Sequence, residues 1–155
     1  MPGRDRPTAA TRRLAVATAL AGLFVAATGR AAEVVVTVNG LGAGKGRVAA
    51  ALHAASRADA FPAKEAAVAA QWRDVAFGPA RFRFVGVPPG RYAVAVHHDA
   101  DGDGALDTDL FGAPTEGVGF SGNATARDGA PAFGAAAFRV PAADSRVRTG
   151  IAIAD

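Results

Sequence analysis

The residues best suited to chemistry form an acidic run directly after a predicted strand. Five carboxylates fall within eleven positions, in the order D-x-D-x-D-G-x-x-D-x-D from Asp99 to Asp109. Like charges at this density repel one another in water, whereas a hard cation such as Ca²⁺ takes about six to eight oxygen ligands at once. The run therefore predicts a calcium site.

The first part of the run matches the calcium-binding loop of EF-hand proteins, and its last part does not. Gly104 stands at the sixth position, where that loop turns sharply, but the twelfth position, which holds a bidentate glutamate in EF-hands, is Leu110. Shorter D-x-D-x-D-G-x-x-D loops need neither that glutamate nor flanking helices. The predicted calcium ligands are Asp99, Asp101, Asp103, the carbonyl of Ala105, Asp107 and Asp109. A solvated acidic turn and a Mg²⁺ or Mn²⁺ site are the alternatives, since Asp and Gly are also common turn residues.

A second set of residues near the run offers groups for binding a ligand. These candidates are His98, Thr115, Glu116, Phe120 and Asn123. His97 and His98 are neighbours on a predicted strand, so they point to opposite faces. We expect His98 to be hydrogen-bonded at the edge of the core and His97 to be solvated.

These residues leave three functions open. The first is a calcium-stabilised module that binds an unknown envelope or extracellular ligand or has a structural role. The second is a hydrolase that acts on a glycan or envelope component through Glu116, His98 and the acidic loop, because glycosidases use a pair of carboxyl groups. The third is an interaction module that docks a partner through residues 111–134. A role other than catalysis is the expectation, and no residue is assigned a catalytic role.

Other motifs give less support to catalysis. Ser121 lies in the sequence GFSG, which is not the G-x-S-x-G motif of serine hydrolases. The glycine-rich segment 42–46 matches neither a dinucleotide-binding fingerprint nor a P-loop, so we predict a hairpin loop there. The chain has no cysteine, which excludes disulfides and a lipoprotein anchor.

The N-terminus has the pattern of an export signal. Four arginines precede residues 14–27, an uncharged and mostly apolar stretch, and signal peptides have an apolar region of about 7–15 residues. We therefore expect residues 1–32 to be a signal peptide and residues 33–155 to be one domain in the periplasm or outside the cell. The general secretory route is favoured over the twin-arginine route, because the residues after Arg12-Arg13 fit that motif poorly. We expect the signal to be cleaved, which leaves no stable membrane span. The alternative is that residues 14–27 stay in place as an uncleaved membrane anchor.

The net charge of the predicted domain excludes one class of partner. The whole chain carries a net charge of +3, but from Glu33 onward there are 12 basic and 13 acidic residues. The excess of positive charge therefore belongs to the predicted signal. We expect no nucleic-acid binding, because such proteins concentrate basic residues on their surface.

The rest of the chain reads as short strands separated by turns. Residues of high strand propensity, such as the run VVVTV at 34–38, alternate with Gly- and Pro-rich breaks. Strict alternation predicts that Phe82 and Phe84 point inward and that Arg81 and Arg83 point outward. The predicted strands cover 33–41, 47–55, 71–75, 80–85, 91–98, 135–140 and 146–154, with a short helical piece at 63–69. We predict an all-β chain: a single antiparallel β-sandwich of about seven strands, immunoglobulin-like or transthyretin-like, with a long Gly-rich loop after the acidic turn.

The chain also resembles a known family, the small exported bacterial proteins grouped as the DUF2141 domain. The resemblance rests on Phe61-Pro62, PPGRYAVAV at 88–96, His98-Asp99 with the acidic loop to Asp107, and PTEGVGFS at 114–121. Members of the family often have Asn in place of Asp101, Asp103 and Asp109, and usually Tyr in place of Val118 and a second Asn in place of Gly122. The additional aspartates favour a cation. The resemblance implies an exported β-sandwich and brings no known activity.

Overall fold

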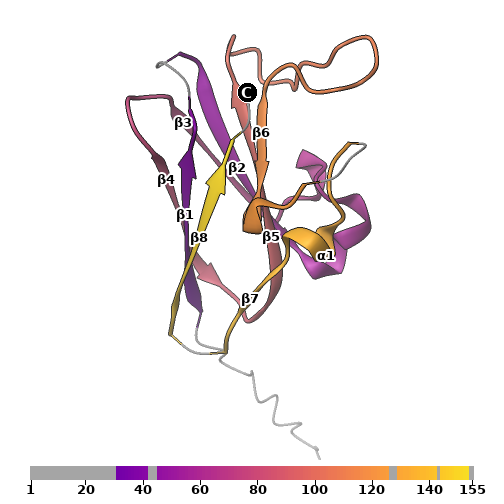
Figure 1. Ribbon diagram of the computed structural model, residues 1–155. Helices are drawn as coiled ribbons and strands as arrows, with labels where there is room; N and C mark the ends of the chain where they lie inside the picture. The colour runs from indigo at the N-terminus through magenta and orange to yellow at the C-terminus, as the bar shows by residue number, and fades with distance from the viewer. Residues whose placement is uncertain (1–30, 42–44, 126–128, 143, 154–155) are drawn as a thin grey trace, which may run out of the picture.

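The computed structural model describes residues 31–41, 45–125, 129–142 and 144–153. Within these ranges the chain forms eight β-strands, three short 3₁₀-helices and one short α-helix (Figure 1). The strands are β1 Ala32–Asn39, β2 Arg47–Ala54, β3 Ala69–Asp74, β4 Ala80–Val87, β5 Gly90–Asp99, β6 Gly117–Phe120, β7 Phe138–Val140 and β8 Arg146–Ala152. The helices are η1 Ala55–Ala60, η2 Lys64–Ala66, η3 Ser121–Asn123 and α1 Phe133–Ala136. The predicted signal peptide lies outside the described residues, apart from its last two positions.

The strands form two sheets that enclose one apolar core. One sheet has the order β4-β1-β8, and the other has the order β3-β2-β5-β6, with β7 paired to the start of β5. Because successive strand residues point to opposite faces, every second side chain faces the other sheet. The core includes Val34, Val36, Val38, Phe82, Phe84 and Ile151 from the first sheet and Val48, Ala50, Leu52, Val94 and Val96 from the second. The predicted all-β class and the inward direction of Phe82 and Phe84 are confirmed.

The strand pairing is not purely antiparallel, which corrects one prediction. β1 pairs antiparallel with β4 on one side and parallel with β8 on the other, with Val36 opposite Thr149. Alternation within a strand specifies which face is buried but not which strand lies alongside or in which direction. The immunoglobulin-like or transthyretin-like topology stays a prediction.

The predicted long loop at 111–134 is also wrong in part. It contains β6, which pairs with β5, as well as η3 and the start of α1. β6 was not recognised because two of its four residues are glycines, which are depleted in strands. Gly119 is needed there, because a Cβ atom at this position would lie 2.7 Å from Cγ2 of Ile151 and 2.8 Å from the carbonyl oxygen of Ala152.

Two further element predictions need correction. The predicted helical piece at 63–69 is the three-residue turn η2, and Ala69 already belongs to β3. The N–H of Val68 donates to the carbonyl of Leu52, which draws this segment onto the edge of β2. The predicted strand at 135–140 begins instead as α1, and only its end is β7.

The outer face of the larger sheet carries the features that concern function. The 3₁₀-helices η1 and η2 (magenta in Figure 1) and α1 project from this side of the sheet, away from β4, β1 and β8. A second apolar cluster forms there around Phe133, Ala136 and Ala93, with Phe61 and Phe120 packed against it. The acidic loop extends on the same side at the other end of the strands (orange, Figure 1).

Candidate functional site

The acidic loop folds around its own carboxylates. Asp99, the last residue of β5, is fully buried, and its two oxygens accept hydrogen bonds from the N–H groups of Gly102 (2.7 Å) and Gly104 (3.0 Å). Both glycines have φ above +80°, a conformation that costs other residues energy. Farther along, Asp101 accepts from the N–H of Asp103 at 3.1 Å. The D-x-D-x-D-G spacing therefore produces a series of tight turns.

Glu116 anchors the far end of this loop. Its side chain is only 6% exposed, because it precedes β6 and points beneath the loop. One carboxylate oxygen accepts from the N–H of Ala100 at 2.7 Å, and the other accepts from the N–H of Asp107 at 3.2 Å. The second oxygen also lies 2.7 Å from Nε2 of His97. Glu116 thus joins the two ends of the acidic run to the sheet.

Two groups of three carboxylates converge within this loop. One group is Asp99, Asp101 and Asp103, and the other is Asp101, Asp107 and Glu116. In each group one oxygen per residue lies within 4.8 Å of the others, and Asp101 belongs to both. These are all hard oxygen donors, the type that Ca²⁺ and Mg²⁺ prefer. The donor set therefore fits a hard divalent cation.

Asp109 does not join these groups, although the sequence pattern predicted it as a ligand. One of its carboxylate oxygens accepts from the N–H groups of Phe111 (2.8 Å) and Ala113 (2.9 Å), so the side chain closes the next turn. Ala105, predicted to contribute its carbonyl, donates its N–H to Asp103 at 2.7 Å. Glu116, which the sequence placed in the second set of candidates, lies in one of the two carboxylate groups. No spacing rule links Glu116 to the run, because the pairing of β6 with β5 brings it there.

The protonation of two carboxyl groups reflects this crowding. Burial by itself would raise the pKa of Glu116, but hydrogen bonds from His97 and from the amides of Ala100 and Asp107 outweigh burial and lower that pKa. The pKa of Asp107 is raised, first by desolvation and then by the negative charges of Asp101 and Glu116, with smaller contributions from two other aspartates. A cation would relieve the repulsion that acts on Asp107.

The other predicted site residues have mainly structural contacts. His98 is 8% exposed, and its Nε2 lies 3.0 Å from the carbonyl oxygen of Lys45, as expected for the edge of the core. Thr115 donates its N–H to the carbonyl of Asp107 at 2.9 Å. Phe120 packs its ring 5.8 Å from that of Phe61. Asn123 has a φ of +49° and accepts from the N–H of Ala152, which connects η3 to β8.

His97 contradicts the expectation of a solvated side chain. It is 19% exposed and hydrogen-bonded to Glu116, and its ring meets that of Trp72 edge to face, with 6.3 Å between centroids. The alternation rule placed it correctly on the outer face of the sheet. That face is covered here by the loop, which the sequence pattern does not indicate.

A groove of 670 Å³ lies on the outer face of the larger sheet, between the acidic loop and the η1–η2 segment. This volume falls within the range of about 300–1,000 Å³ typical of small-molecule sites. Its lining includes Ala51, Phe61, Trp72, Ala95, His97 and Leu106. Sequence reasoning missed this groove, because no residue pattern indicates that a sheet face is left open.

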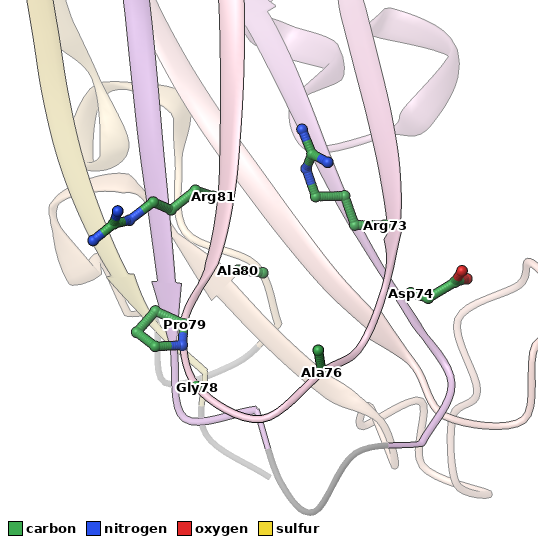
Figure 2. Close-up of a pocket in the computed structure, with 7 residues that line it drawn as sticks. All are labelled: Arg73, Asp74, Ala76, Gly78, Pro79, Ala80 and Arg81. Carbon is green, nitrogen blue, oxygen red and sulfur yellow. The ribbon is translucent and has the colours of Figure 1, made fainter.

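A smaller hollow of 230 Å³ occurs at the turn between β3 and β4. Figure 2 shows that its charged side chains, Arg73, Asp74 and Arg81, point in different directions. The labelled residues therefore present no converging set of polar groups. Unlike the groove, this hollow has no aromatic wall among its lining residues.

Comparison with known proteins gives a family but no precedent for activity. No curated protein and no solved structure matches this chain. Among the described residues, no helix has the length and apolar character needed to cross a membrane. A family described as "uncharacterized protein conserved in bacteria" (DUF2141) matches residues 36–148, which include the second half of β1, all of β2 to β7, the start of β8 and the whole acidic loop. The chain therefore belongs to the DUF2141 family.

Proposed function

We propose that this chain is an exported, calcium-stabilised β-sandwich that binds a ligand on the outer face of its larger sheet. The observation that carries the proposal is the convergence of two carboxylate groups on Asp101, with Glu116 reaching the loop from the position just before β6. A cation held there connects the end of β5 to the start of β6. The same loop contributes Leu106 to the wall of the groove, so the cation would also fix the shape of the ligand site.

The site resembles extracellular calcium modules in its chemistry. Four of its carboxylates, those of Asp99, Asp101, Asp103 and Glu116, are already held by backbone N–H groups, so little ordering remains to be done when the ion binds. Asp101 and Asp103 are exposed and each accepts one backbone N–H through a single oxygen, and Asp107 is exposed as well. We expect a dissociation constant of about 10⁻⁴–10⁻³ M, as in extracellular modules. Such an affinity suits the export that the N-terminal sequence predicts.

Thermal unfolding of the purified protein tests the proposal. At a Ca²⁺ concentration about ten times the dissociation constant, binding to the folded state alone stabilises by about 1.4 kcal/mol. For a domain of this size the midpoint should rise by about 3–6 °C relative to excess EDTA. Mg²⁺ should raise it less, because Mg²⁺ demands a stricter octahedral geometry and gives up water reluctantly.

A matched pair of variants makes the test specific. Asp101→Asn removes one charge from both carboxylate groups but keeps an oxygen to accept the N–H of Asp103. Asp109→Asn makes the same chemical change in the same loop at a residue outside both groups. The Ca²⁺ response should disappear in the first variant and persist in the second. If Ca²⁺ leaves the wild-type midpoint unchanged, or if the two variants respond alike, the calcium site is refuted.

The hydrolase alternative has less geometric support. It relied on Glu116 acting with His98, but His98 contacts the carbonyl of Lys45, and the partner of Glu116 is His97. A glycosidase also needs one carboxyl group that stays protonated to act as the acid. The pKa of Glu116 is lowered and its oxygens are occupied by three hydrogen-bond donors, so this residue is suited to holding the loop. A binding role is therefore the function we favour.

A further inference from the structure

The floor of the groove consists of alanines at positions where an exposed sheet face usually carries large polar side chains. Ala51 of β2 and Ala95 of β5 lie directly opposite each other in the ladder. Ala51 also pairs with Ala70 of β3 on its other side, and Ala95 pairs with Phe120 of β6. One row of the sheet is thus free of bulky side chains across three adjacent strands. A ligand can approach the backbone closely there.

Aromatic side chains bound this row on both sides. In the neighbouring row, Trp72 and His97 flank Ala49, and their rings meet above it. On the opposite side Phe61 packs edge to face on His53, and Phe120 closes the alanine row at β6. Rows on one face of a strand are about 7 Å apart, since each residue rises about 3.3 Å, so the rows of Ala49 and His53 are about 13 Å apart. The alanine row between these ring systems forms the flat floor of a slot, and a flat molecule fits such a slot better than a bulky one.

The charges around the slot favour a positively charged occupant. Among the residues that the structure describes, the charged ones in its lining are Asp59, Glu65 and Lys64, one more acid than base. The acidic loop supplies Leu106 and Thr108 to the wall at the other end, between the carboxylates of Asp103 and Asp109. Even with one divalent ion bound, the combined negative charge of the carboxylates of this loop and of Glu116 exceeds the positive charge of the ion. The local potential is therefore negative and repels anions.

We propose that the groove binds flat, apolar organic cations, with the ring system over Ala51 and Ala95 and the positive charge toward the acidic loop. Trp72 is partly exposed beside this position, and its ring already makes a cation–π contact with the guanidinium of Arg47 at 5.0 Å. The attraction of a further cation therefore comes from the acidic groups around the groove. This proposal rests on the proposed binding role of the outer face. It does not require that calcium be the ion in the loop.

Titration with thioflavin T, a flat cationic dye, tests the assignment. Trp72 is the only tryptophan of the chain, so quenching of its emission reports binding at the groove. We expect saturable quenching by thioflavin T and at least tenfold weaker binding of the anionic dye 1-anilinonaphthalene-8-sulfonate. Excess EDTA is present throughout, so the result does not depend on Ca²⁺. A failure here therefore differs from a failure of the Ca²⁺-dependent midpoint shift.

Two matched variants show where the dye binds. Ala51→Phe fills the slot, whereas Val85→Phe adds the same ring at an exposed position of β4, in the other sheet. We expect Ala51→Phe to weaken dye binding at least tenfold and Val85→Phe to leave it within twofold. Ala95→Leu replaces Ala51→Phe if circular dichroism shows that the latter does not fold. The proposal is overturned if wild type does not bind the cation, if the anion binds as tightly, or if filling the slot has no effect.

Discussion

Replacing His53 with leucine should stabilise the protein and make its stability less sensitive to acid. His53 lies on β2 and is fully buried, and neither of its ring nitrogens has a hydrogen-bond partner among the described residues. Its ring packs edge to face against Phe61, with 5.0 Å between centroids. Burial alone lowers the pKa of His53 below its usual value, since no charged neighbour contributes to the shift. Burial in the folded state therefore favours the neutral form of this imidazole.

The size of the effect follows from these two features. A buried polar group without a partner costs about 1–3 kcal/mol, so His53→Leu should gain up to that amount at pH 8, less any cost of altered packing. In the unfolded chain a histidine takes up a proton below about pH 6.5. Because the pKa of His53 is lowered in the folded state, its contribution is complete above that pH and is lost as the pH falls. The wild type should therefore lose stability through this residue as the pH falls from 7 to 5.5.

Urea unfolding at pH 8, 7, 6 and 5.5, followed by circular dichroism, measures both quantities. The other titrating groups are shared by the two proteins, so the difference between their unfolding free energies isolates His53. That difference should widen in favour of His53→Leu as the pH falls from 7 to 5.5. His53→Phe, which keeps a ring beside Phe61, should show the same loss of pH dependence. Parallel pH profiles for wild type and His53→Leu would refute the argument that the buried imidazole is neutral.

Two further predictions concern the junction of β5, β6 and β8. Gly119→Ala should lower the free energy of unfolding by about 1–3 kcal/mol, because the new Cβ would contact Ile151 at 2.7 Å; Gly150→Ala, with nothing within 4 Å, should change it by less than about 0.5 kcal/mol. Equal urea midpoints for these two variants would contradict the close approach of β6 to β8. Ser121→Ala should cost about 1–3 kcal/mol, because it leaves the buried N–H of Val94 without its acceptor at 2.9 Å. Rapid hydrogen exchange at that amide would confirm the cause, and an unchanged exchange rate would argue against it.

Patterns over a few neighbouring residues allowed sequence predictions that the structure confirms. Alternation in β4 identified Phe82 and Phe84 as core residues, and both are nearly or fully buried. The same rule placed His97 and His98 on opposite faces of β5. The family could also be recognised, because its motifs are contiguous segments. In each case the physical cause is local, since strand geometry alternates side chains whatever the partner strand is.

The arrangement of the acidic loop could be predicted from the sequence only in part. Its spacing predicted that Asp99, Asp101 and Asp103 would converge, and they do. It also predicted Asp109 as a ligand, but Asp109 closes a turn of its own. A spacing rule counts residues along the chain and does not include an oxygen that arrives from another strand. Glu116 is such a residue, and its role depends on the pairing of β6 with β5.

What the sequence alone determined is thus the all-β class, the buried faces of the long strands, the family and the location of the acidic turn. Only the tertiary structure decided that β8 lies parallel to β1, that Glu116 contacts His97, and that the outer sheet face carries an open groove. Each of these joins segments that are distant in the sequence. These contacts depend on how the two sheets bury a common core. That arrangement cannot be inferred from hydrophobic periodicity or from motif spacing.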